Sequence, residues 1–132
     1  MSIQYRNIKE FQPKELQDLF QSVKWISGQY PEKLKKAMKH SDTVFSAWDD
    51  EKLIGLINAL DDNSMTVYIH FLLVHPDYQG KGVGKELLRM INEKYIDYLR
   101  VVLIADEEET GFYHNSGFEI ANRTKPMFIN RF

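Results

Sequence analysis

The chain has 132 residues, of which 43% are hydrophobic, so it can bury one core of ordinary domain size. Its net charge of −2 and the lack of a basic block exclude a nucleic-acid binder held by phosphate contacts. It has no cysteine, which excludes disulfides and thiolate chemistry, and no apolar run as long as a membrane span. The first residues lack the apolar stretch of a signal peptide. We therefore expect a single domain over residues 1–132 that is cytoplasmic, with no nucleic-acid or membrane partner.

The first half of the chain is predicted to form a strand, two helices and three strands. Residues 3–8 alternate loosely between apolar and polar, as in a short strand. Leu16, Leu19, Phe20 and Val23 then recur at helical spacing, after a proline that suits the first turn of a helix. A second, shorter helix and three strands follow, at residues 32–39, 43–49, 52–60 and 65–74.

The second half of the chain begins with a glycine-rich stretch that leads into a helical pattern. Residues 100–105 (RVVLIA) are typical of a fully buried strand. Residues 109–119 predict a short helix ended by Gly117, and residues 126–132 (PMFINRF) a last strand. Strands mixed with helices in this order indicate an α/β domain in which helices cover a mixed sheet.

The stretch HPDYQGKGVGKELL, residues 75–88, places three of the seven glycines at alternate positions before a predicted helix. The first amides of a helix have no internal partners, and the helix dipole is positive there, so this end binds anions such as phosphate. Glycines allow a positive φ and a close approach to the ligand. The residues expected to contribute amides or charge are Gln79, Gly80, Lys81, Gly82, Val83, Gly84 and Lys85.

The glycine spacing does not fit the two common nucleotide motifs. A Walker loop requires Ser or Thr after its Gly-Lys pair, and here Lys85 is followed by Glu86. The dinucleotide fingerprint is G-x-G-x-x-G, whereas this stretch reads G-x-G-x-G. Nucleotide binding without coenzyme A, and a tight connection that binds no ligand, stay open as alternatives.

Gln79, Gly82 and Gly84 resemble the acyl-coenzyme A signature Q/R-x-x-G-x-G/A of the GCN5-related N-acetyltransferases, the GNAT family. The later stretch FYHNSGFE resembles that family's F-Y-x-x-x-G-F element, and the predicted order of elements is similar too. The resemblance implies the GNAT fold, a mixed, mostly antiparallel sheet of about six to seven strands flanked by four helices. A narrower resemblance, carried by IADEEETGFYHNSGFE and KPMF, is to plant-type serotonin N-acetyltransferases and their bacterial relatives.

The resemblance implies an N-acetyltransferase with acetyl-CoA as co-substrate. Without a cysteine to carry the acetyl group, direct attack by a primary amine in a ternary complex is favoured. The pantetheine arm would pair with the backbone of the predicted strand 65–74, and the pyrophosphate would lie on the glycine loop. Beside the loop residues, those expected to contact acetyl-CoA are Leu72, Leu73, Val74, Phe112 and Tyr113.

The acid and the base are expected among a few side chains. An amine of pKa about 10.4 is mostly protonated at pH 7, so a base must remove its proton. His70 and Asp106 are the main candidates, and Glu107 or Glu108 acting through water is a further alternative. The resemblance pairs Asp106 with Tyr113, and the phenol of Tyr113 is suited to protonating the departing thiolate. His70, Asp106 and Tyr113 each have an alternative, purely structural role. His70 would be a strand side chain with a structural partner, Asp106 would cap a helix, and Tyr113 would be an aromatic residue of the core.

The acceptor is the least determined part of the sequence-based hypothesis. Trp25 and Tyr30 flank the loop between the first two helices, where they would line an amine pocket or only pack a lid. A small-molecule amine is favoured, with a protein N-terminus or lysine, and a non-catalytic acyl-CoA sensor, as alternatives. The histidines at 40, 70, 75 and 114 have no metal-ligand spacing, so no metal is expected. By resemblance, a homodimer joined through residues 127–132 is also expected.

Overall fold

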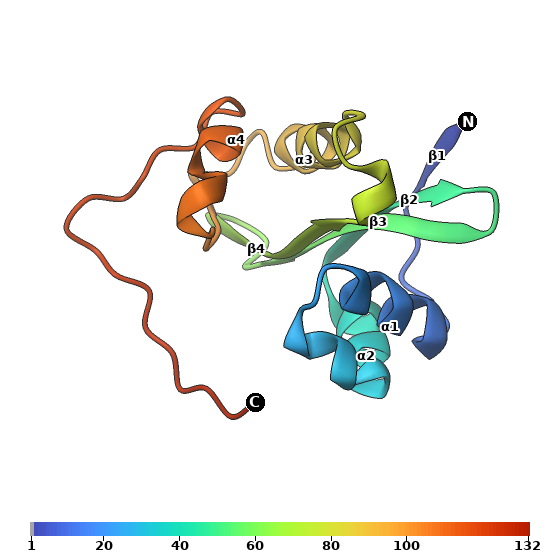
Figure 1. The fold of residues 1–132 in the computed structure, drawn as a ribbon. Coiled ribbons are helices and arrows are strands. Elements are labelled where there is room, and N and C mark those ends of the chain that lie inside the picture. Colours follow the sequence, from blue (N-terminus) through green and yellow to red (C-terminus); the bar gives the residue numbers. More distant parts are fainter. Residues whose placement is uncertain (1) are drawn as a thin grey trace.

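The computed structural model describes residues 2–132, and Figure 1 shows a sheet with α1 and α2 on one face and α3 and α4 on the other. The strands are β1 (Ile3–Arg6), β2 (Thr43–Asp49), β3 (Lys52–Asp61), β4 (Thr66–Val74) and β5 (Arg100–Val102). The helices are α1 (Pro13–Ser22), α2 (Pro31–His40), α3 (Val83–Lys94) and α4 (Thr110–His114). Short 3-10 turns span Ile26–Gln29, Pro76–Tyr78 and Glu107–Glu109. The predicted α/β class, with its mixed, mostly antiparallel sheet and four helices, is confirmed.

The five strands lie side by side in the order in which they occur along the chain. The first three pairings are antiparallel, and the last, between β4 and β5, is parallel. A two-residue turn at Asp50 and Glu51 joins β2 to β3, and Asp50 takes a φ of 52° there, which short polar residues tolerate. The long connection from β4 to β5 contains α3, as a parallel crossover requires.

The core lies on both faces of β3, the central strand, whose residues 53–59 are all buried. Because side chains alternate along a strand, this run supplies apolar residues to two helical layers at once. On the α3 face the strand contributes Ile54, Ile57 and Ala59, which cluster with Leu87, Leu88 and Ile91. On the α1 face it contributes Leu53 and Leu56, which cluster with Leu16, Leu19 and Phe20.

A buried amide fixes an irregularity in β4. The register runs from Asn58 opposite Phe71 to Ala59 opposite Ile69, so His70 is an extra residue that opposes nothing in β3. Asn58, only 1% exposed, accepts a hydrogen bond from the Phe71 amide at 2.9 Å and donates one to Ser41 Oγ at 3.1 Å. The side chain of Asn58 thus replaces the ladder bond that the bulge removes.

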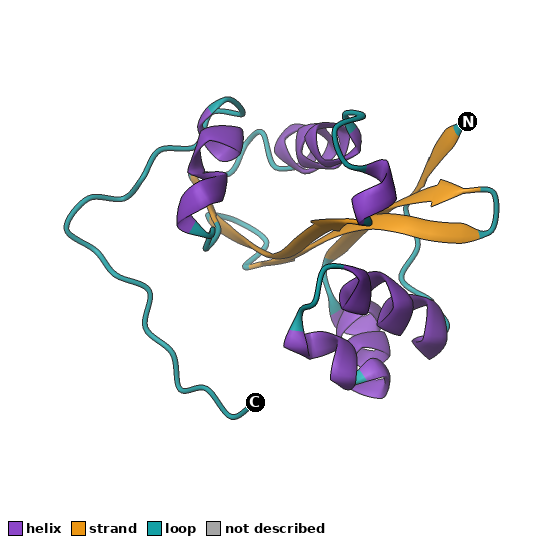
Figure 2. Cartoon of the chain, in the orientation of Figure 1, coloured by secondary structure: helices purple, strands orange, loops and turns teal. Residues whose placement is uncertain are grey.

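Three details of the predicted strands are wrong. The sheet has five strands rather than six or seven. The strand predicted over residues 100–105 is not fully buried, because β5 is an edge strand of three residues, and Arg100 is exposed. The last strand predicted over residues 126–132 is absent from this structure: the segment after α4 is exposed and leaves the sheet (Figure 2). Its apolar residues suit a strand but have no neighbouring strand in this chain.

Replacing Asn58 with leucine, which has a similar shape and no polar atoms, tests the bulge. The Phe71 amide would lose its acceptor, so we expect the free energy of unfolding to fall by about 1–3 kcal/mol in urea titrations. Asn92→Leu on α3 is the control, because Asn92 makes one long bond of 3.4 Å to the Ser116 carbonyl and should matter less. Equal effects of the two substitutions would contradict the role given to Asn58.

Candidate functional site

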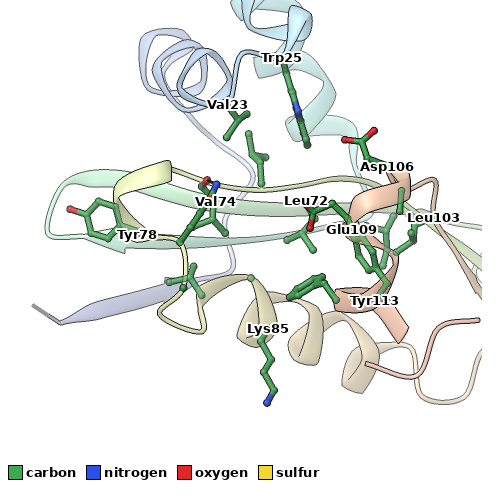
Figure 3. Close-up of a pocket in the computed structure, with 18 of the residues that line it drawn as sticks. Val23, Trp25, Leu72, Val74, Tyr78, Lys85, Leu103, Asp106, Glu109 and Tyr113 are labelled. Carbon is green, nitrogen blue, oxygen red and sulfur yellow. Dashed lines mark hydrogen bonds between the residues drawn. The ribbon is translucent and has the colours of Figure 1, made fainter. Parts of the chain in front are cut away.

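A cleft opens where β4 and β5 part. Their pairing covers three residue pairs and ends at Tyr68 opposite Val102. Beyond that point β4 pairs only with β3, through Ile69 and residues 71–74, and a cleft of about 590 Å³ lies beside this part of the strand (Figure 3). The apolar second half of β4 is therefore a wall of this cleft and is not buried on both faces. Its free edge can accept another extended chain.

The glycine loop forms one end of the cleft. Gly80 and Gly82 have φ of 77° and 83°, which L side chains rarely adopt, and a Cβ at either would meet no atom within 4 Å. Gly82 directly precedes α3, and the first hydrogen bond of that helix runs from the Glu86 amide to the Gly82 carbonyl. The backbone amides of the three residues before Glu86 have no carbonyl partner within the helix, so they can donate hydrogen bonds to an acceptor outside it.

The other charged and polar residues of the loop take different positions. The Gln79 side chain donates to the Val74 carbonyl at 2.9 Å and so ties the loop to the end of β4. Lys81 does not line the cleft, and its Nζ lies 5.8 Å from the ring centre of Tyr78. Lys85 lines the cleft through its backbone region, but its side chain extends away from it in Figure 3. The amides, not the lysines, are thus the groups aimed at the cleft.

At Gly84, in its first turn, α3 lies against α4. A Cβ at this position would sit 3.5 Å from the Phe112 ring and 3.6 Å from a Val74 methyl. Phe112 in turn meets the Tyr113 ring edge to face, with centres 5.1 Å apart. The loop, the end of β4 and α4 are therefore in contact around one end of the cleft.

Tyr113 projects from α4 into the cleft (Figure 3). Burial, together with the nearby carboxylates of Glu109 and Asp106, raises the pKa of Tyr113 to about 12. Asp106 precedes the 3-10 turn Glu107–Glu109, but only its carbonyl bonds to that turn, accepting from the Glu109 amide at 2.9 Å. The Asp106 side chain caps nothing, so its carboxylate is exposed at the rim of the cleft.

His70, the bulge residue of β4, lines the cleft with its ring stacked on that of Phe71. The ring centres are 3.9 Å apart, and Tyr68 lies at 5.7 Å on the same strand. Loss of water around the ring lowers the pKa of His70 from its ordinary 6.5, although part of the side chain is exposed. The structural alternative for His70 predicted a partner for its side chain, and that partner is the stacked ring of Phe71.

The two aromatic residues predicted to line an amine pocket lie in different places in the structure. Trp25 lines the cleft, where its ring lies 6.1 Å from that of Phe71, and Figure 3 shows it projecting toward Asp106. Tyr30 does not line the cleft; its ring lies 6.0 Å from that of Phe132. Of the two, only Trp25 is thus a residue of the cleft.

The cleft also contains residues that the sequence analysis did not select as site residues. Most are apolar or lie in loops, where no pattern marks a lining residue before the fold is known. Glu109 is the one with a usable signal, since it stands one turn before Tyr113 on the same short helical segment. These additional lining residues are Val23, Ile69, Tyr78, Leu103, Ile104, Ala105 and Glu109.

Residues 2–132 contain neither a metal-binding cluster nor a membrane-spanning helix. No group of three or more His, Asp or Glu side chains in this part of the chain is placed to hold a metal ion. None of its helices is long and apolar enough to cross a membrane.

Comparison with known proteins identifies related sequences and folds. The sequence model of the acetyltransferase (GNAT) domain matches residues 9–127. An uncharacterized N-acetyltransferase ycf52-like protein of Prochlorococcus marinus is 36% identical over 114 residues, which are 80% of this chain and 62% of that protein. A histone acetyltransferase, TAP1, of Glycine max is 32% identical over 118 residues, 80% of this chain and 51% of that protein. The chain spans 60–67% of the length of the algal and cyanobacterial relatives it matches.

A solved structure extends the likeness to the whole fold. The GNAT family acetyltransferase SP0256 of Streptococcus pneumoniae superposes with a TM-score of 0.85 at 29% sequence identity. The superposition covers 98% of this chain and 99% of that protein. The order of elements and the sheet described above are thus those of a known structural family.

The pKa of His70 can be measured by NMR titration of the imidazole signals, with His70 identified by its loss in His70→Gln. We expect a midpoint below 6.5, because the stacked ring disfavours the charged form. With a depressed folded-state pKa, the stability contributed by neutral His70 is full above pH 6.5 and is lost as the pH falls through that lower value. The same titration in urea gives the reference, and a folded midpoint at or above it would contradict this account.

Proposed function

Because the chain belongs to the GNAT acetyltransferase family, we propose that it moves an acetyl group from acetyl-CoA to a primary amine. The observation that carries the proposal is the cleft itself, in which a free strand edge, a glycine loop at a helix N-terminus and Tyr113 meet. The proposal covers the chain as a single catalytic domain acting in the cytoplasm.

The residues around the cleft fit acetyl-CoA in two places. The free edge of β4 at Leu72, Leu73 and Val74 would pair with the amides of the pantetheine arm, as with a further strand. The pyrophosphate would lie on the amides from Gly80 to Lys85, where the space above Gly80 and Gly82 is open. Phe112 would line the thioester end together with Tyr113.

The transfer would proceed by direct attack of the amine. The amine nitrogen forms a bond to the thioester carbonyl carbon, the carbon–sulfur bond breaks, and the sulfur leaves with the electron pair. A backbone amide near Val74 would stabilise the oxyanion that forms before the sulfur departs. The chain has no cysteine that could carry the acetyl group between acetyl-CoA and the amine.

His70 is the base in this proposal and Tyr113 the acid. With a pKa below 6.5, His70 is neutral at pH 7 and able to accept the proton of the amine. With a pKa of about 12, Tyr113 keeps its proton at pH 7 and can give it to the thiolate. Asp106, exposed at the rim, and Glu109 would instead attract the cationic amine.

The acceptor in this proposal is a small amine. Trp25 gives one wall an aromatic surface, and the carboxylates of Asp106 and Glu109 give the cleft a negative charge. Such a site suits a cation with an apolar body. A protein lysine is the second candidate, supported by the name of the soybean relative as a histone acetyltransferase. The likeness to serotonin N-acetyltransferases stays a prediction.

Tyr113→Phe tests the proposed function through release of CoA thiol from acetyl-CoA in the presence of a panel of amines. Because the chain has no cysteine, a thiol reagent reports only free CoA. We expect turnover to fall by about 10²-fold or more, while the affinity for acetyl-CoA changes little, since only the proton donor is removed. Tyr5→Phe, on β1 away from the cleft, is the matched control.

The outcomes of this assay separate the alternatives. Amine-dependent release by the parent protein establishes the transferase, and unchanged turnover in Tyr113→Phe would remove Tyr113 from the mechanism. If acetyl-CoA raises the melting temperature but neither small amines nor lysine peptides cause release, the protein is a non-catalytic sensor and the proposal fails. Release with lysine peptides alone would favour the second candidate acceptor.

Gly82→Val tests the loop. Valine at this position would strain the backbone and also occupy the open space above the loop, so we expect acetyl-CoA affinity to fall by at least 10-fold. Gly117→Val is the control, because Gly117 has a φ of 97° and an equally open Cβ position but does not line the cleft. Calorimetric titration of both variants, after their melting temperatures are compared, measures the effect. Equal affinities in the two variants would argue against a pyrophosphate on the loop.

A further inference from the structure

The residue directly before the glycine loop makes a hydrogen bond to a distant strand. Tyr78 ends the 3-10 turn Pro76–Tyr78, and its hydroxyl donates to Oδ2 of Asp49 at 2.5 Å. Asp49 is the last residue of β2 and stands 29 residues earlier in the chain. The bond to Asp49 raises the pKa of Tyr78 above its ordinary value, so the phenol keeps its proton and donates at pH 7.

Asp49 is a firm point of attachment. It pairs with Lys52 across the two-residue turn and with Ile3 of β1, so its backbone is held on both sides. Its neighbour Trp48 is buried in the core and stacks on Phe11. A hydrogen bond to Asp49 therefore ties the start of the glycine loop to the body of the sheet.

The other bonds in this region hold the turn that precedes the glycines. The His75 amide donates to the Ile54 carbonyl of β3 at 2.8 Å, and the Tyr78 amide donates to the His75 carbonyl at 2.8 Å. The Gln79 side chain reaches back to the Val74 carbonyl. These bonds fix the end of β4 and the turn, and the Tyr78 hydroxyl adds a tie to β2 where the glycines begin.

The glycines give the loop its shape but do not hold it in that shape. Gly80 and Gly82 have positive φ, and a glycine reaches many other φ values at little cost in energy. Unless the loop is anchored, a ligand must order its amides on binding, and the affinity is lower as a result. Tyr78 can serve as the anchor, because its ring is half-buried against the core on the α3 side of the sheet.

The ring of Tyr78 is a second link between the loop and the sheet. The ammonium nitrogens of Lys52 and Lys81 lie 5.7 Å and 5.8 Å from its centre, within the range of a cation–π contact. Lys52 begins β3, whereas Lys81 belongs to the loop. These contacts involve the ring and not the hydroxyl, so a substitution by phenylalanine removes the hydrogen bond alone.

We propose that Tyr78 is a positioning residue for acetyl-CoA, because its bond to Asp49 holds the glycine loop in its binding shape before the ligand arrives. Figure 3 shows the Tyr78 hydroxyl pointing away from the cleft, and the residue lies well apart from Tyr113. Tyr78 thus acts through the loop and not on the reacting atoms. The inference rests on the proposed function, since it takes acetyl-CoA as the ligand of the loop.

Tyr78→Phe tests the inference through the affinity for acetyl-CoA, measured by calorimetric titration. We expect the affinity to fall by about 10-fold, because a hydrogen bond to a charged group is lost from the free protein. In the thiol-release assay, KM for acetyl-CoA should rise while kcat at saturating acetyl-CoA stays within about twofold of the parent value. An unchanged affinity would overturn the inference.

Tyr95→Phe is the matched control. Tyr95 also donates its hydroxyl to an aspartate, Asp61, at 2.7 Å, but it does not line the cleft. Its substitution should lower the melting temperature and leave the affinity for acetyl-CoA unchanged. If Tyr95→Phe weakened binding as much as Tyr78→Phe, the effect would be one of general stability and the positioning role would be wrong.

Substitutions of Asp49 show whether the partner is the one that matters. Asp49→Asn keeps an oxygen that accepts from Tyr78, so the affinity for acetyl-CoA should stay within about threefold of that of the parent. Asp49→Ala removes the acceptor and should weaken binding about as much as Tyr78→Phe. The double variant Tyr78→Phe/Asp49→Ala should be no weaker than either single variant, and additive losses would contradict the proposed bond.

NMR relaxation of the loop amides without any ligand separates this inference from the proposed function. The amides of Gly80 and Gly82 should have order parameters of about 0.85 in the parent and fall toward about 0.6 in Tyr78→Phe. Equal order parameters in the two proteins would overturn the inference even if acetyl-CoA binds. If the parent binds no acetyl-CoA, the proposed function fails, and positioning of that ligand by Tyr78 fails with it, whereas the order parameters still decide whether Tyr78 holds the loop.

Discussion

The candidate site depends on one constraint, the parting of β4 and β5 after Tyr68 and Val102. If the pairing continued past these residues, the backbone edge of β4 would be occupied by β5. Because it stops, one strand has a free edge, and the glycine loop and α4 close the cleft from two sides. The bulge at His70, held by Asn58, lies where the strands separate. Bulges are found beside functional sites because they redirect side chains at such a point.

Partial burial shifts the pKa values of His70 and Tyr113 in opposite directions. It lowers the pKa of His70, which is charged when protonated, and raises the pKa of Tyr113, which is charged when deprotonated. Both shifts favour the neutral form of the side chain. In the proposed reaction, the neutral imidazole would accept a proton and the protonated phenol would donate one.

The end of the chain shows how a correct local preference gives a wrong strand. Residues 126–132 were predicted as a strand from their apolar and β-favouring side chains, but a strand exists only where another strand pairs with it. In this structure residues 126–132 have no such neighbour, and β5 is left as a short, partly exposed edge. The same absence explains why residues 100–105 are not the buried strand that their apolar run suggests. The missing strand at residues 126–132 and the exposure of residues 100–105 both concern the outer edge of β5.

The sequence by itself determined the α/β class, the helices and the first four strands, because apolar spacing follows the geometry of each element. It also located the glycine loop, since positive φ at Gly80 and Gly82 requires glycine. Only the tertiary structure decided which side chains share the cleft. Trp25 lies on the side of α1 and α2, yet it lines the same cleft as Asp106 and Tyr113 from the other side of the sheet. Tyr30 does not line this cleft. Such neighbours are set by how strands part and layers stack, and spacing along the chain carries no record of that.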